Sequence, residues 1–272
     1  MATAITLASV AMASEPPLAG TEGAERAARE LRERHGVRAP SDLHVERMAC
    51  DEGAYVSWGE TGGADAFIVH GPKTARICVA ERLRGTPRGR WSLAHELAHW
   101  HLHRHLGADA LARIHGRGVK TGRDFRYERE ADAFVTELLM ARDGFAPLCD
   151  HARPEVAHLD VLAAEHGTST TATGKRYASL ASRAACALLE CKDGVIQRAT
   201  RSRAWRGEAV KGRQVEATTA VAALMGGHAI PPGPRAVHGD AWGHAALGDV
   251  EMTEHAIAIP ESRSAIVWLW HA

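Results

Sequence analysis

The sequence lacks the features that mark membrane, secreted or nucleic-acid-binding proteins. Its 272 residues hold 33 basic and 33 acidic side chains, so no net field draws the protein toward nucleic acid or anionic lipid. No apolar run approaches the roughly 20 residues of a membrane span. The five cysteines show no Cys-x-x-Cys spacing, which is typical of thiols in a reducing cytosol. We therefore expect a cytoplasmic protein that does not bind membranes.

The N-terminus also lacks the basic residue that a secretory leader needs ahead of its apolar stretch, although Ala11-Met12-Ala13 resembles a signal-peptidase site. We expect residues 1–20 to be disordered, with export as the alternative. A chain of this length forms one large domain or two small ones. The patterns along the chain predict a first domain at 21–150, a helical hairpin at 151–183 and a small C-terminal domain at 184–272.

The most informative feature that is present is a His-Glu-x-x-His motif formed by His95, Glu96 and His99. Residues four apart on a helix share one face and lie about 6 Å apart along its axis, so both imidazoles can bind one metal ion. Glu96 is turned so that its carboxylate reaches a water molecule beside the metal, as a catalytic base does. Residues 86–105 predict a helix with Thr86 as its N-cap. A His-rich solvated helix is the alternative, because 17 histidines make a chance match plausible.

A catalytic zinc site needs three protein ligands and one open position. Residues 125–142 predict an amphipathic helix on which Glu128 and Asp132 share the apolar face. Buried carboxylates are costly unless a cation compensates them. We therefore expect Glu128 to bind the metal and Asp132 to accept a hydrogen bond from the far nitrogen of a ligand histidine. The alternatives are that both acids pair with neighbouring arginines, or that Glu130 is the ligand.

A three-histidine site is a rival, because His105 has the spacing of the metzincin motif. That motif needs glycine at the position of Leu102, so that the chain can turn out of the helix. A helix that continues carries His105 about 9 Å beyond His99 along the axis. His103 fails by the same geometry, since it lies about 12 Å from His95. The set of two histidines and one glutamate is therefore favoured.

The remaining pattern predicts an α+β fold, in which a helix at 21–36 and a small antiparallel sheet accompany the two motif helices. The strands of this sheet are expected at 55–58, 66–70 and 75–80. A strand beside the cleft would be able to pair with an extended peptide substrate. The Gly-rich segment 116–124 predicts a loop, either a connector or a lid.

Residues 154–182 predict two helices joined by Gly167-Thr168-Ser169, a spacing that resembles a helix-turn-helix. They carry no basic stripe, which favours a hairpin packed on the peptidase over one that binds DNA. Beyond them we expect a small α/β domain, with a loop at 230–242. Its other elements are strands at 186–190, 195–200, 256–259 and 264–270 and a helix at 215–225. Its histidines lack ligand spacing; they are His228, His238, His244, His255 and His271.

These segments together resemble the ImmA/IrrE family of metallo-endopeptidases. The resemblance rests on residues 90–103, which contain Leu-Ala-His-Glu-Leu-Ala-His and Leu-His, and on residues 128–140, which contain Glu-Arg-Glu-Ala-Asp-Ala-Phe and Leu-Leu-Met. It extends over most of residues 21–270. Asp132 stands where the family usually has Asn, and an acid there binds an imidazole N–H at least as well. The proline that usually follows Leu-Leu-Met is absent, which affects only the end of the helix.

The resemblance implies a gluzincin-like fold in which His95, His99 and Glu128 bind one zinc ion and Glu96 is the base. It also implies cleavage of a partner transcriptional repressor inside bacterial cells. We expect no separate DNA-binding domain ahead of the peptidase, and we therefore expect the repressor to be a second protein with a helix-turn-helix.

The expected reaction also uses a group that stabilises the transition state, and Tyr127 and His103 are the candidates. Two other functions stay open. One is a DNA-binding regulator that uses residues 154–182 and a structural zinc ion. The other is a zinc-holding protein that binds a repressor without cleaving it.

Overall fold

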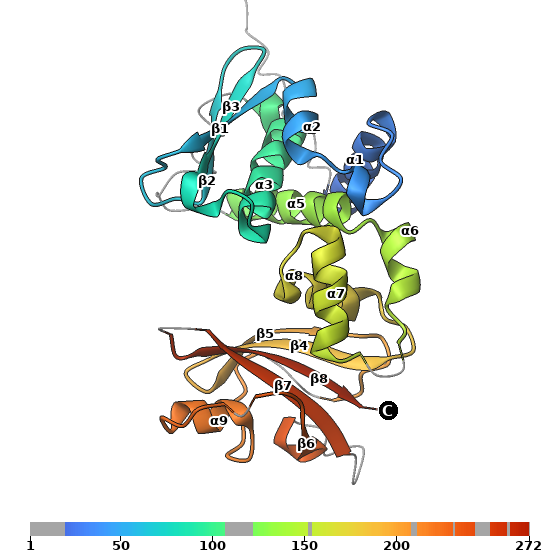
Figure 1. Cartoon of the computed structure of the whole chain (residues 1–272), viewed down its shortest axis with the longest axis vertical. Coiled ribbons are helices and arrows are strands. Elements are labelled where there is room, and N and C mark those ends of the chain that lie inside the picture. Colours follow the sequence, from blue (N-terminus) through green and yellow to red (C-terminus); the bar gives the residue numbers. More distant parts are fainter. Residues whose placement is uncertain are drawn as a thin grey trace, which may run out of the picture.

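A computed structural model describes residues 20–106, 122–151, 154–207, 211–230, 232–242, 251–259 and 262–271. Figure 1 shows three parts along the long axis: helices around a small sheet, a helical hairpin, and a larger sheet. The expected α+β fold is confirmed. Residues 1–19 of the expected disordered segment, residues 116–121 of the expected loop, and His244 lie outside the described residues. The domain boundaries at 150 and 183 stay a prediction.

Helices frame the first part, and their apolar faces meet in one core. They are α1 (Gly20–Arg34), α2 (Val45–Asp51), α3 (Pro87–His103) and α5 (Gly122–Leu139). Helix α5 packs against both α1 and α3. Leu31 of α1, Leu97 of α3 and Leu138 of α5 are completely buried in this core. Burial of each of these leucine side chains contributes about 1.5–3 kcal/mol to the free energy of folding. This contribution holds α3 and α5, the two helices that carry the motifs, together.

Helix α5 differs from its expected bounds at both ends. It begins at Gly122, so residues 122–124 are helical and do not belong to a loop. It ends at Leu139 because the backbone is extended at Ala141, with φ −55° and ψ 132°, before a short helix α6 (Arg142–Phe145). The metal-ligand candidates of the second motif are therefore well inside the helix, where side-chain directions are regular.

The sheet of the first part is mixed, and the expectation of an antiparallel sheet is wrong. It consists of β1 (Ala54–Gly59), β2 (Ala66–His70) and β3 (Ala75–Ala80), in the order β1-β3-β2. Strands β2 and β3 form an antiparallel hairpin, whereas β1 runs parallel to β3 with Val56 opposite Ile77. The chain after β1 passes to the far edge of the sheet before it returns. Hydrophobic patterns identify strands but do not specify the direction in which they pair.

The expected helical hairpin consists of α7 (Val156–His166) and α8 (Thr170–Leu180). Gly167 ends α7 in the left-handed conformation, and the Ser169 side chain caps α8. Helix α8 lies very close to the larger sheet, because a Cβ at Gly174 would be only 2.5 Å from Leu188 Cδ1. The hairpin therefore packs directly on the larger sheet and lies between that sheet and the helices of the first part, as Figure 1 shows.

The larger sheet is antiparallel throughout and has the strand order β5-β4-β8-β7-β6. Its strands are β4 (Ala185–Lys192), β5 (Val195–Arg201), β6 (Arg235–His238), β7 (Glu251–Ile259) and β8 (Ser264–His271). One face packs on α7 and α8, and the other faces α9 (Ala220–Met225). Among the described residues, no helix has the length and apolar character that a bilayer span requires.

Two details of this last part correct the sequence expectations. Helix α9 is shorter than 215–225 because the Thr219 side chain caps it only from residue 220. Strand β6 lies in the segment 230–242, where the sequence predicts a loop, and Arg235 stands opposite Glu254. This short strand has little pattern of its own, so its pairing depends on the neighbouring strand.

Candidate metal centre

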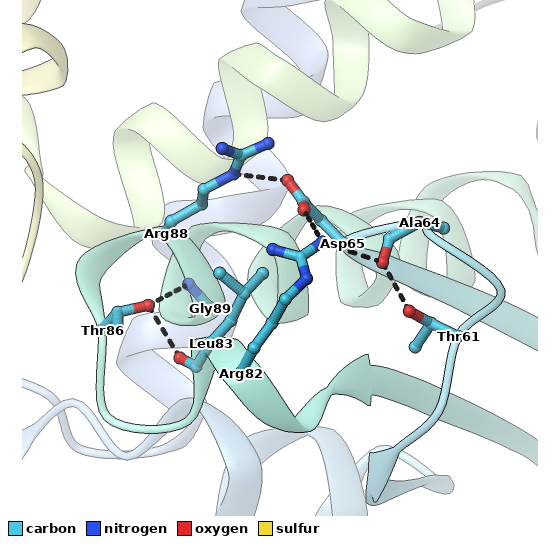
Figure 2. A network of polar contacts seen from close by, with 8 residues as sticks. All are labelled: Thr61, Ala64, Asp65, Arg82, Leu83, Thr86, Arg88 and Gly89. Carbon is cyan, nitrogen blue, oxygen red and sulfur yellow. Dashed lines mark hydrogen bonds and ion pairs between the residues drawn. The ribbon is translucent and has the colours of Figure 1, made fainter. Parts of the chain in front are cut away.

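Helix α3, which carries the His-Glu-x-x-His motif, is anchored at its first turn. The hydroxyl of Thr86 accepts a hydrogen bond from Gly89 N at 3.0 Å and donates one to Leu83 O at 2.7 Å, as Figure 2 shows. Pro87 occupies the first helical position, where no intrahelical partner for an N–H is needed. These contacts define where the helix begins and hence the rotation of the face that carries the histidines.

A carboxylate ties the loop before β2 to this first turn. Asp65 accepts hydrogen bonds from Arg82 Nη2 at 2.7 Å and from Arg88 Nε at 2.5 Å (Figure 2). Partial burial of Asp65 raises its pKa, but the two guanidinium groups outweigh this effect and hold the pKa below its usual value. Nearby, Thr61 Oγ1 donates to Ala64 O at 2.5 Å and closes the same loop.

We expect Gly89→Ala to destabilise the protein by about 1–3 kcal/mol, the usual cost of overpacking. A Cβ at Gly89 would lie 2.2 Å from Leu83 O, so the capping turn of α3 would have to move. Urea unfolding followed by circular dichroism measures the change. Gly144→Ala is the matched control, because a Cβ there meets nothing within 4 Å and should leave stability equal or slightly higher. Equal effects of the two substitutions would contradict this role of Gly89.

The candidate ligands converge from two helices. His95 and His99 of α3 turn their Nε2 atoms toward each other at 3.1 Å, and Glu128 Oε2 of α5 is 3.1 Å from the first nitrogen and 3.8 Å from the second. The three ligand atoms lie within 4.8 Å of one another. His99 is fully buried, whereas the side chains of His95 and Glu128 are 19% and 26% exposed, so the group is open to solvent on one side. Two imidazoles, one carboxylate and one open side match the requirements of a catalytic metal site.

Asp132 lies behind His95, one helical turn beyond Glu128. Its Oδ1 is 3.3 Å from His95 Nδ1, the ring nitrogen that faces away from the ligand group. A carboxylate in this place holds the ring in the orientation that presents Nε2 to a metal. The side chain is 60% exposed, so the expectation that Asp132 lies on the buried apolar face of the helix is wrong.

Glu130 and His103 lie on the opposite, buried side of His99. The Nδ1 atoms of His99 and His103 are 3.0 Å apart, and His103 Nε2 is 3.1 Å from Glu130 Oε2. Glu130 is therefore separated from the ligand group by an imidazole and does not take the place of Glu128. Both ring nitrogens of His103 are engaged and the residue is only 2% exposed, so this position gives no support to its expected role at the transition state, which stays a prediction.

The other two sequence candidates, Tyr127 and His105, are not part of the ligand group. Tyr127 is buried, and its ring meets that of His103 edge-on with centroids 4.9 Å apart. This position gives no support to its expected role at the transition state. His105 lies in a 3-10 turn (Arg104–Leu106) beyond α3, is exposed, and is not part of the ligand group. The three-histidine alternative therefore does not fit the structure.

Residues 58–177, which include both ligand-bearing helices, match the family model of the IrrE N-terminal-like domain, Peptidase_M78. This domain belongs to the ImmA/IrrE family of metallopeptidases. No curated protein matches the chain. Among solved structures, a Mycobacterium tuberculosis transcriptional regulator is similar at 14% identity and a TM-score of 0.58, over 92% of this chain and 76% of that one. At this identity the similarity concerns the fold alone.

In the ImmA/IrrE-family domain, the surroundings of the ligand group raise the pKa values of His95 and of the neighbouring Glu96. Burial of Glu96 raises its pKa to about 7; the charge of His95 opposes this shift and that of Glu128 adds to it. Burial of His95 works against its charged form, yet hydrogen bonds to Asp132 and Glu128 raise its pKa to about 10. A carboxylate with a pKa near 7 is suited to accept and return a proton.

We expect metal binding to release about one proton near pH 8, because an imidazole must be neutral to bind a metal. His95 has a raised pKa of about 10 and is the source. Affinity should therefore weaken about tenfold for each unit that the pH falls from about 10 toward 7. Titration calorimetry with zinc in two buffers of different protonation enthalpy counts the protons. Asp132→Asn should lower the number released at pH 8, and equal release from both proteins would contradict the assignment to His95.

Proposed function

We propose that this protein is a zinc-dependent endopeptidase and that Glu96 is its general base. The observation that supports this proposal is the convergence of His95 Nε2, His99 Nε2 and Glu128 Oε2 next to the buried carboxylate of Glu96, in a domain of a metallopeptidase family. The donor set fits zinc, which takes nitrogen and carboxylate ligands in a tetrahedral arrangement. The exposed edges of His95 and Glu128 leave space for the fourth position, where water and substrate would enter.

The chain's own residues account for the proton transfers of peptide hydrolysis. When bound, a zinc ion supplies a Lewis acid and lowers the pKa of a water molecule toward about 7. Glu96 accepts the proton of the attacking water on a carboxylate oxygen and then delivers it to the nitrogen of the leaving amine. Its pKa of about 7 suits both steps. Asp132 holds His95 in place throughout.

We further propose that the substrate lies in a cleft of about 770 Å³ that begins at Asp132. The walls of the cleft come from the first turn of α3, from α8 and from strands β4 and β5. Strand β2 is at the edge of its sheet, and Asp65 just before it lines the cleft. An extended segment of substrate would therefore be able to add to β2 through main-chain hydrogen bonds.

The substrate that we propose is a partner transcriptional repressor that contains a helix-turn-helix. We propose that cleavage takes place in the cytoplasm, where such a repressor binds DNA. The resemblance to the ImmA/IrrE family supports this choice. The similar solved structure is that of a transcriptional regulator, which is consistent with a regulatory circuit.

The test mixes the zinc-loaded protein with a purified helix-turn-helix protein encoded beside its gene, and with a library of unfolded peptides. We expect two repressor fragments whose new termini are read by mass spectrometry. Cleavage should stop on chelation and return when zinc is added. Cleavage of the library alone would overturn the substrate and keep the enzyme. A stable complex without fragments in any mixture would instead identify a zinc-holding partner that does not cleave.

Direct DNA binding through residues 154–182 has less support. In a helix-turn-helix the second helix, here α8, enters the major groove and must present one free face. The buried residues of α8 are Thr173, Gly174, Arg176, Tyr177 and Ala178. Among them, Gly174 lies against Leu188 of the larger sheet, so this side of α8 is covered. A gel shift that strengthens as salt falls would be the result that favours DNA binding.

A further inference from the structure

A continuous row of polar atoms leads from the candidate metal centre to the start of α1. It runs from His99 Nδ1 to His103 Nδ1 at 3.0 Å, and from His103 Nε2 to Glu130 Oε2 at 3.1 Å. The second carboxylate oxygen of Glu130, Oε1, accepts a hydrogen bond from the backbone N–H of Gly20 at 2.9 Å. His99, His103 and Glu130 are 0%, 2% and 3% exposed, so this row lies within the protein.

The direction of each hydrogen bond follows from the need of the metal for a lone pair. If His99 Nε2 binds the metal, a neutral His99 carries its proton on Nδ1 and donates it to His103 Nδ1. A neutral His103 then carries its proton on Nε2 and donates it to Glu130. The carboxylate only accepts, which is the role that it also has toward Gly20. Every ring nitrogen in the row thus has a compatible partner, which matters because unsatisfied buried polar groups are costly.

Two further contacts hold the end of the row in place. Gly20 is the first residue of α1, so the Glu130 carboxylate sits at the positive end of a fifteen-residue helix. The ring of Tyr127 packs edge-on against His103. The arrangement differs from that at His95, where the carboxylate of Asp132 contacts the ligand ring directly.

We propose that His103 and Glu130 are positioning residues that hold His99 in the tautomer and orientation required for metal binding. Glu130 acts on His99 through the imidazole of His103, and α1 contributes by anchoring Glu130. This inference rests on the metal site of the proposed function. It adds His103, Glu130 and the start of α1 to that site. His99 is then oriented by the carboxylate of Glu130, as His95 is by that of Asp132.

The experiment measures the zinc affinity of the full-length protein by competition with a chromophoric chelator. Glu130→Leu removes the acceptor, and we expect zinc binding to weaken about 10–100-fold, as is typical for groups that orient metal ligands. Glu130→Gln keeps a neutral oxygen for His103 but loses the charge, and its amide cannot accept from both donors. Its loss should be intermediate, because charge-assisted hydrogen bonds are about twice as strong as neutral ones.

Glu137→Gln is the matched control, because Glu137 is another fully buried carboxylate of α5 that pairs with Arg176 and Arg29. It should keep the zinc affinity of the wild type, whatever its effect on stability. Cobalt substitution gives a second readout: the visible spectrum should change in the Glu130 variants and stay unchanged in the control.

Wild-type affinity and spectrum in Glu130→Gln, or equal losses in Glu130→Gln and Glu137→Gln, would overturn the positioning role. Neither result needs Glu130→Leu to fold. The proposed function would be intact if the wild type still bound zinc and cleaved its substrate. A wild type that binds no zinc would instead refute the metal site itself.

Discussion

Replacing Glu96 with Gln should lower the cleavage rate by about 10²–10⁴-fold and leave zinc bound. That range is the usual contribution of a general base, and an amide cannot accept the proton of the attacking water. Zinc should stay because Glu96 is not one of the three converging ligands, which are His95, His99 and Glu128. Gln has nearly the same size as Glu, so packing around this buried side chain should be preserved.

The measurement compares cleavage rates of the repressor substrate at equal zinc content, which elemental analysis verifies. Glu81→Gln serves as the control, because this acid is exposed and pairs with Arg84 outside the site. A Glu96→Gln protein that cleaves as fast as the wild type would refute the role of Glu96. Loss of zinc from that variant would show that the carboxylate contributes to metal binding.

The second large effect concerns stability. Arg176→Met should destabilise the protein by about 3–5 kcal/mol, the typical cost of removing one partner of a buried ion pair. The Glu137 side chain is completely buried, and that of Arg176 is 4% exposed. The same guanidinium donates from Nε to Met140 O at 3.0 Å, so it also binds the chain just after α5. Removing it leaves Glu137 with Arg29 at 3.3 Å and with the backbone N–H of Arg142 at 3.1 Å.

Urea unfolding of the two single variants and the double variant measures the coupling between these side chains. We expect Arg176→Met combined with Glu137→Met to recover much of the lost stability, because apolar replacement of a whole buried ion pair is often neutral. A loss below about 1 kcal/mol for Arg176→Met alone would contradict the importance of the pair, since that is the value of a surface ion pair.

The sequence predicted what depends on a single helix. Thr86 and Pro87 predict the start of α3, and the spacing of His95 and His99 puts both rings on one face. The same periodicity puts Glu128 and Asp132 on one face of α5. Each of these relations involves residues a few positions apart, where helix geometry leaves little freedom. The structure then brings the two faces together, with Glu128 Oε2 3.1 Å from His95 Nε2.

The sequence does not predict the row of polar atoms behind His99, for a physical reason. His103 is four residues from His99, but this spacing alone indicates only that the two side chains share a helix face. Its partner Glu130 comes from another helix, and the anchor of Glu130 is the first backbone N–H of α1. Contacts among three helices depend on how their apolar faces pack, and a pattern along one helix does not contain that information.

The same distinction applies to the whole chain. The helices, most strands and the candidate ligand types with their spacing can be predicted from the sequence, because local backbone geometry and periodicity govern them. Packing between distant elements sets the parallel direction of β1 relative to β3, the position of α8 against the larger sheet, and the contact of Glu130 with His103. Those outcomes depend on distances between elements far apart along the chain, which are set when their buried surfaces pack together.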